Sequence, residues 1–152
     1  MNNLHRELAP ISDAAWADIE AETTRTLKRY LAGRHVVDVC APGGVGLSAV
    51  GTGHLETIAA PGEGILARQR LVKALVELRV PFELDRQQID DVERGANDSD
   101  FQPAKEAAQK IAYAEDRAIF DGYPAAGIGG IRQGTSNPIM TPRTTCVRIP
   151  TP

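Results

Sequence analysis

Apolar residues recur at helical spacing in two long stretches of the chain. The first predicts an amphipathic helix from about residue 13 to 32, because Ser12 is a favourable N-cap and Gly33 a common helix stop. The second predicts a helix over about 102–120, with negative charge and caps from residues 97–100 and an end at Gly122. The first stripe is Trp16, Ile19, Thr23, Leu27, Tyr30 and Leu31, and the second is Ala104, Ala107, Ala108, Ile111, Ala114, Ala118 and Ile119. We expect Trp16 to pack in the core.

Strand-like and turn-like patterns fill the region between these helices. Residues 35–39 read as a strand, and residues 75–84 give the strongest strand signal, although Pro81 places part of it at a sheet edge or bulge. Residues 49–50 and 55–58 are candidate short strands of a long hairpin. Asp85, with Gln88 three residues on, resembles a capping box for a short helix through Arg94, closed by Gly95.

Glycine and proline punctuate residues 43–64, where apolar content is thin. A loop of this length is unusual inside a compact domain, which indicates that its contacts lie on another chain. Beyond residue 122 the composition becomes that of a loop, and residues 141–152 have no core-forming period.

Composition favours one domain with a core, since the 152 residues are 42% hydrophobic and 24% charged. The net charge of -3 and the absence of a Lys/Arg cluster give no reason to expect nucleic acid. The N-terminus mixes acids and bases without an apolar run, and no stretch is long and apolar enough to span a bilayer, so we expect neither a secretory signal nor a membrane partner. Two cysteines, Cys40 and Cys146, fit a reducing cytoplasm, the expected location.

Candidate catalytic chemistry is weak. Gly44-x-Gly46-x-x-Ala49 formally matches a dinucleotide fingerprint, but later glycines and Pro61 would break the helix that this mechanism needs. Asp90 and Asp91 are adjacent on a helix and point apart, and we expect Glu115 and Asp116, with Arg117, to form ion pairs on the helix surface or between subunits rather than an acid-base pair. The histidines with Cys40 lack zinc-ligand spacing. We therefore expect no catalytic residue, cofactor or metal. The carboxylates considered are Asp90, Asp91, Glu93, Glu115, Asp116 and Asp121, and the histidines are His5, His35 and His54.

In order along residues 1–140, several short motifs resemble the encapsulins, the linocin-type family 1 encapsulating proteins. They are residues 1–4 (MNNL), 8–10 (LAP), Trp16, 32–39 (AGRHVVDV), 77–82 (ELRVPF), 89–95 (IDDVERG), 98–100 (DSD), 114–120 (AEDRAIF) and 136–138 (SNP).

This resemblance implies an α+β fold of the tailed-phage capsid (HK97) type, present only in part. Residues 1–42 would be an N-terminal arm, helix and first strand, and residues 43–73 an extended loop reaching a neighbouring subunit. Residues 74–140 would be a partial peripheral domain with its spine helix, and the axial domain would be missing. Read one nucleotide earlier, suitable codons for residues 141–152 give a sequence resembling the family's continuation, so we hypothesise that this tail is out of frame after a frameshift.

The implied function is that of a structural shell subunit, not an enzyme, which self-assembles into an icosahedral homo-oligomer. Its cargo would be a dye-decolourising peroxidase or a ferritin-like protein carrying a C-terminal targeting peptide. The resemblance places the peptide site on the inner surface near the first helix, with Leu27, Tyr30 and Leu31 supplying apolar contacts. Arg34 and Asp38 have two open roles: they either fix the position of the peptide through polar contacts or form salt bridges within the subunit. The rival interpretations are a prophage major capsid protein and a nucleotide-dependent enzyme.

Overall fold

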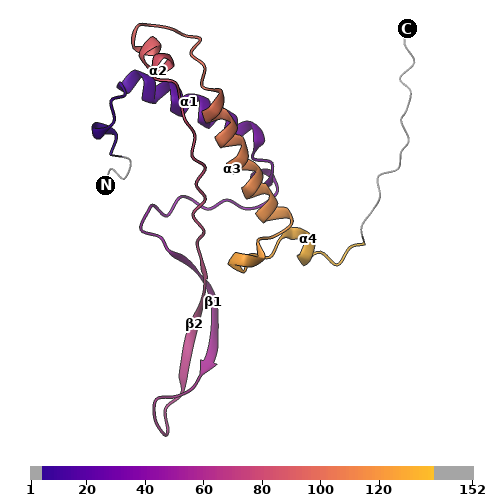
Figure 1. The fold of residues 1–152 in the computed structure, drawn as a ribbon. Helices are drawn as coiled ribbons and strands as arrows, with labels where there is room; N and C mark the ends of the chain where they lie inside the picture. The colour runs from indigo at the N-terminus through magenta and orange to yellow at the C-terminus, as the bar shows by residue number, and fades with distance from the viewer. Residues whose placement is uncertain (1–4, 139–152) are drawn as a thin grey trace, which may run out of the picture.

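Residues 5–138 are described by a computed structural model that combines helices with a two-stranded antiparallel sheet. The helices gather at one end, and the sheet is a hairpin pointing away from them (Figure 1). The elements are η1 (Arg6–Leu8), α1 (Asp13–Tyr30), η2 (Gly33–His35), β1 (Ala49–Ile58), β2 (Ala67–Ala74), α2 (Arg86–Glu93), α3 (Gln102–Phe120), η3 (Pro124–Ala126) and α4 (Ile131–Gly134).

The first helix begins as predicted and ends two residues earlier, at Tyr30. The hydroxyl oxygen of Ser12 accepts a hydrogen bond from the Ala15 backbone N–H at 3.3 Å, which caps α1. Trp16 is only half-buried, so the core prediction was too simple. The Arg6 guanidinium lies 4.9 Å from the centre of its ring and pairs with Glu20, so the N-terminal arm covers this side chain.

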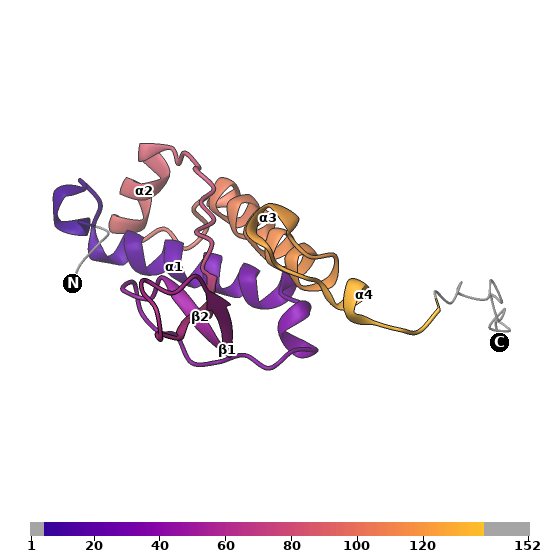
Figure 2. The ribbon, with the colours of Figure 1, turned by 90° about the horizontal axis from the view of Figure 1, so that it is seen from below.

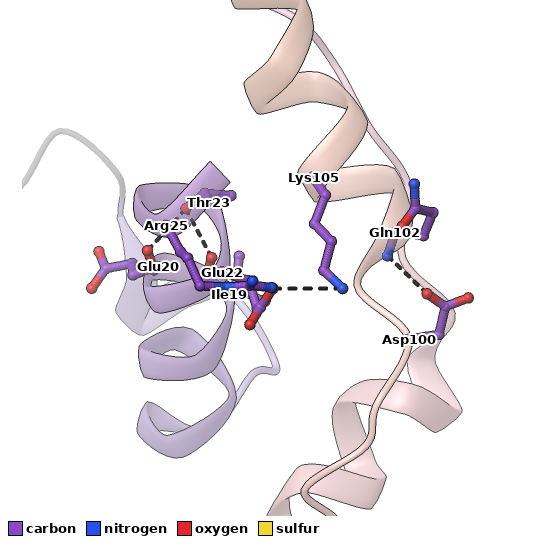
Figure 3. Close-up of polar contacts among 8 residues, drawn as sticks. All are labelled: Ile19, Glu20, Glu22, Thr23, Arg25, Asp100, Gln102 and Lys105. Carbon is purple, nitrogen blue, oxygen red and sulfur yellow. Dashed lines mark hydrogen bonds and ion pairs between the residues drawn. The ribbon is translucent and has the colours of Figure 1, made fainter. Parts of the chain in front are cut away.

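The second and third helices also follow the predicted boundaries. The Asp85 carboxylate accepts a hydrogen bond from the Gln87 N–H at 2.9 Å and caps α2. The predicted capping box is wrong, because the Gln88 side chain instead accepts a hydrogen bond from the Asp100 N–H. Asp100 in turn accepts one from the Gln102 N–H at the start of α3 (Figure 3).

The core lies where α1, α2 and α3 meet. In two perpendicular views α1 and α3 lie against each other (Figures 1 and 2). Alanines on α3 let the two helix axes approach closely, and Ala104, Ala107 and Ala108 of the predicted stripe are buried, whereas Ala114 is exposed. The main buried cluster is Ala15, Ile19, Val92, Phe101 and Ala104, against which Ile11, Leu84 and Ile89 pack.

Two predicted strands are not strands in this structure. Residues 35–39 begin in the 3-10 turn η2 and continue as irregular chain, because η2 is held by α3 rather than by a sheet. Residues 75–84 lie outside any strand and have no ladder partner among the described residues. A strand signal in the sequence becomes a strand only where a second segment supplies the hydrogen bonds.

The hairpin is longer and more continuous than predicted. Residues 49–50 and 55–58 belong to one strand, β1, which pairs with β2 from Ala49 opposite Ala74 to Ile58 opposite Ala67. At its base the Lys73 ammonium donates a hydrogen bond to the Gly127 carbonyl at 3.1 Å, in the turn after α3. The region after residue 122, expected to be loop, contains the short turns η3 and α4.

Candidate functional site

The five residues predicted to receive a cargo peptide lie at and beyond the C-terminal end of α1. Leu27 and Tyr30 are on the helix, Leu31 caps it, and Arg34 lies in η2. Leu27, Tyr30 and Leu31 are half-buried, while Arg34 and Asp38 are exposed. The fold therefore brings four of the predicted residues to one helix end, followed by Asp38 in irregular chain.

Asp116 of α3 holds the turn that follows α1. Its carboxylate accepts hydrogen bonds from the backbone N–H groups of Ala32 at 3.0 Å and Gly33 at 2.7 Å. A Cβ atom added at Gly33 would lie 2.6 Å from the Ile119 side chain and 2.9 Å from Asp116. Gly33 therefore does more than stop the helix, since a larger residue here would force the Ile119 and Asp116 side chains to shift.

Arg34 forms an ion pair within the subunit, one of the two roles that the sequence left open. Its guanidinium donates to both carboxylate oxygens of Glu115, at 2.6 and 2.8 Å. Its hydrogen bond to Glu115 raises the pKa of Arg34 above its ordinary value. Bidentate geometry fixes the direction of the guanidinium more firmly than a single contact would.

Tyr30 completes the contact with α3 through an aromatic pair. Its ring meets that of Tyr113 edge to face, with centroids 5.6 Å apart. The Arg29 guanidinium lies 5.7 Å from the Tyr30 ring centre. Tyr113 is half exposed, so both rings border solvent at this end of the helix pair.

Asp38 has no hydrogen bond or ion pair within residues 5–138. Asp38 is therefore available to bind a charged group of a ligand, whereas the charge of Arg34 is already paired with that of Glu115. Sequence reasoning did not find Tyr113, and it assigned Glu115 and Asp116 to surface or intersubunit ion pairs. Nothing in the local sequence around these three residues of α3 indicates that they lie next to the end of α1.

A second polar link joins the middle of α1 to the start of α3. Glu22 pairs with Arg25 at 2.5 Å and with Lys105 at 3.5 Å (Figure 3). The hydrogen bond from Arg25, with help from the charge of Lys105, lowers the pKa of Glu22 below its ordinary value of 4.5 despite partial desolvation. This cluster ties two helices together and contains no nucleophile or acid-base pair.

Two apolar surfaces remain uncovered by the described residues. The first is the hairpin, where Leu55 is 54% and Leu66 is 68% exposed. The second is a groove of about 580 Å³ between residues 74–78 and α3. Its apolar lining includes Leu75, Val76, Leu78, Ile111, Ala118 and Tyr123.

The alternative chemistry in the sequence is not assembled in the structure. No helix begins at Gly44 or Gly46, and Ala49 instead opens β1, so the helix that dinucleotide binding would need at these glycines is absent, as the sequence predicted. Among residues 5–138, no group of three or more His, Cys, Asp or Glu residues could hold a metal ion. Asp90 pairs with Arg86 and Asp91 with Arg94, so the two adjacent carboxylates have different partners and form no acid-base pair. None of the described helices is both long and apolar enough to cross a membrane.

Sequence comparison defines the family. Residues 1–150 match the model of a family described as "Encapsulating protein for peroxidase", so the chain belongs to that family. It is 59% identical over 141 residues to a type 1 encapsulin shell protein of Mycobacterium tuberculosis, and 59% over 138 residues to one of Rhodococcus erythropolis. A type 1 encapsulin shell protein of Brevibacterium linens is 57% identical over 137 residues.

These alignments confirm the encapsulin resemblance and cover only part of each relative. They include 93%, 91% and 90% of this chain but 53%, 52% and 52% of the respective relatives, so the chain spans about half their length. The family match continues to residue 150, into the segment hypothesised to be out of frame. Residues 141–152 lie outside the described residues, and the frameshift stays a hypothesis.

Proposed function

We propose that this chain is the N-terminal half of an encapsulin shell subunit, a structural protein that assembles with its own kind into a closed cage around a cargo enzyme. The observation that carries the proposal is the 59% identity to shell proteins over 93% of the chain. The hairpin supports it, because its apolar side chains face away from the rest of the described chain and need a partner. No observation favours a phage capsid or a nucleotide-dependent enzyme.

The proposal includes the finer architecture. In it, residues 1–42 form the arm and first helix, residues 43–73 the loop that reaches a neighbouring subunit, and residues 74–140 part of an HK97-type peripheral domain. α3 would be the spine helix of that domain. An icosahedral shell of identical subunits needs contacts between different surfaces of each subunit, and an arm and a long hairpin supply such surfaces.

A chimera provides the test of the shell function. Residues 1–140 are joined to the second half of the Mycobacterium tuberculosis relative, and the product is analysed by size-exclusion chromatography and negative-stain electron microscopy. We expect closed particles. We also expect the double variant Leu55→Asp with Ile58→Asp to abolish the particles. Both side chains are exposed in the subunit, so the substitutions should disturb contacts between subunits more than the fold of the subunit itself.

Thr57→Asp, at an exposed position between the two, is the matched control and should leave particles intact. Failure of the unmodified chimera to form particles, or particles that tolerate both aspartates, would contradict the proposal.

We further propose that the end of α1 receives the cargo peptide, with a peroxidase as the cargo that the family description names. Leu27, Tyr30 and Leu31 would bury aliphatic side chains of an extended peptide, and Asp38 would supply the free charge because Arg34 is held by Glu115. A ferritin-like protein is the other cargo that the resemblance implies. Weak binding at each site would suffice, since the shell repeats it.

Cargo loading tests this site separately from assembly. The chimera is co-produced with a dye-decolourising peroxidase that carries the C-terminal targeting peptide, and haem absorbance is measured in the particle fraction. Leu31→Asp should reduce loading while leaving particle yield unchanged, and Asp13→Ala, at the far end of α1, should affect neither. Equal loading in all three particles would contradict the site.

A further inference from the structure

The ladder of the hairpin is interrupted midway along β1. Gly51 pairs with Val72 and Leu55 pairs with Arg70, so Thr52, Gly53 and His54 lie opposite Leu71 alone. This bulge, Gly51–His54, adds two residues to one strand. Because the addition is even, the residues beyond it keep the same faces as those before it.

One side chain replaces part of the missing backbone ladder. The Thr52 hydroxyl donates to the Leu71 carbonyl at 3.0 Å and accepts a hydrogen bond from the His54 N–H at 3.3 Å. A single hydroxyl thus links the two strands where regular pairing would place backbone bonds. Such a link is exposed and is made by one rotatable side chain, so it opens more easily than a ladder.

The backbone of the bulge is also unusually free. Gly53 has a φ of +77°, in the left-handed region, and nothing lies within 4 Å of a Cβ atom built there. Gly51 likewise has open space around it. Glycine is therefore present for its backbone freedom and not because neighbours leave no room.

Within residues 5–138 the bulge is poorly covered, since Gly51, Gly53 and His54 are all exposed. A hollow of about 430 Å³ borders it, lined by Gly51, Gly53, His54, Leu55, Arg70, Leu71 and Val72. The outer part of the hairpin, residues 55–70, meets the inner part, residues 49–51 with 72–74, only through this weakened section and the continuous strand β2.

We propose that the bulge is a joint at which the outer part of the hairpin changes its angle to the inner part, with Thr52 as the catch. The joint divides the apolar surface into two units, since Leu55, Ile58, Ile65 and Leu66 belong to the outer part and Val50 and Val72 to the inner part. The role of the joint rests on the proposed function. By changing its angle, the joint keeps both apolar units of the hairpin in contact with a neighbouring copy of the chain when the angle between the two copies varies.

Distances between two spin labels test the joint in the chain alone, so that its outcome does not depend on assembly. Labels are attached at Ser48→Cys and Glu63→Cys, with Cys40→Ser and Cys146→Ser removing the native thiols. The two labels lie on either side of the bulge. Because both are on the hairpin, the distance between them does not change when the whole hairpin moves relative to the helices. Deleting Thr52 and Gly53 leaves His54 opposite Leu71 in a continuous ladder, and we expect the distance distribution to narrow to roughly half its width.

A point variant tests the joint independently of the deletion, which could alter the folding of the hairpin. Thr52→Val removes the catch and should broaden the distribution, whereas Thr57→Val, in the regular ladder, should leave it unchanged. A parent distribution as narrow as that of the deletion variant, or identical widths for Thr52→Val and Thr57→Val, would overturn the joint.

Discussion

Asp116, on α3, holds the start of η2, the turn that follows α1, through two hydrogen bonds that a nearby capping residue would normally provide. The first backbone N–H groups of a helical turn have no partner within it, and most are capped by residues close in sequence. Here the capping carboxylate is 83 residues from Gly33 along the chain. The same few residues of α3 also fix Arg34 and Tyr30, so the geometry of the proposed peptide site is set by α3.

Replacing Asp116 should therefore cost more than replacing a typical exposed helix residue. We expect Asp116→Ala to lower the free energy of unfolding by about 1–3 kcal/mol, because the Gly33 N–H loses its acceptor and the Ala32 N–H keeps only the Tyr30 carbonyl. Trp16 is the only tryptophan and reports on α1, so urea unfolding followed by its fluorescence measures the change. Lys110→Ala, at an exposed position of α3, is the control and should have little effect. An equal loss in both variants would show that the carboxylate does not hold the turn.

The lowered pKa of Glu22 predicts acid sensitivity of the α1–α3 contact. Because its folded-state pKa lies below the unfolded one, ionised Glu22 adds stability above about pH 4.5, and this contribution is lost as the pH falls through the folded-state value. Glu22→Gln should thus flatten the dependence of unfolding free energy on pH below that point. Glu56→Gln, an exposed carboxylate on the hairpin, should retain the slope of the parent, and a parental slope in Glu22→Gln would contradict the link.

Elements built from local signals were predicted well from the sequence, and elements that need a distant partner were not. The α3 boundaries, 102–120, follow from an alanine stripe, polar residues before it and Gly122 after it. Residues 35–39 carry β-branched residues, yet hydrogen bonds from Ala32 and Gly33 to Asp116 draw the preceding turn toward α3. Of the five predicted site residues, four meet at one helix end, but their partners Tyr113 and Glu115 depend on how two helices cross, which no local pattern specifies.

Residues 75–84 should behave as a strand without a partner. Apart from Leu75, whose N–H donates to the Ser48 carbonyl, we expect their backbone amides to exchange with deuterium within seconds to minutes, far faster than those in the middle of α3, because they have no ladder partner among the described residues. Mass spectrometry of peptic fragments measures this. The chimera with the second half of the relative should show slower exchange in the same segment, and protection in the chain alone would mean that the segment pairs with itself or another copy.

At the scale of the whole molecule, the described chain has more apolar surface than its own fold covers. The groove beside α3 and the hairpin are both open, and the main core is a small cluster at the meeting point of three helices. Large uncovered apolar areas favour association with other chains or aggregation. Since the relatives have about twice this length, more chain is available in them to cover such surfaces.

The chain alone should therefore form no closed shell. We expect size-exclusion chromatography to give small species or aggregate, together with strong binding of an environment-sensitive apolar dye. The chimera should bind less dye per subunit, because its second half covers part of the exposed surface. Discrete particles of shell size from residues 1–152 alone would contradict this expectation.

The hydrogen bond from Lys73 to Gly127 has a mechanical consequence. It ties the base of the hairpin to the turn directly after α3, at the opposite end of that helix from α2. Movement of the inner part of the hairpin would thus act on the end of α3 through this contact, whereas the proposed joint at the bulge would absorb movement of the outer part. A change at the base of the hairpin can in this way reach α3, the longest helix within residues 5–138.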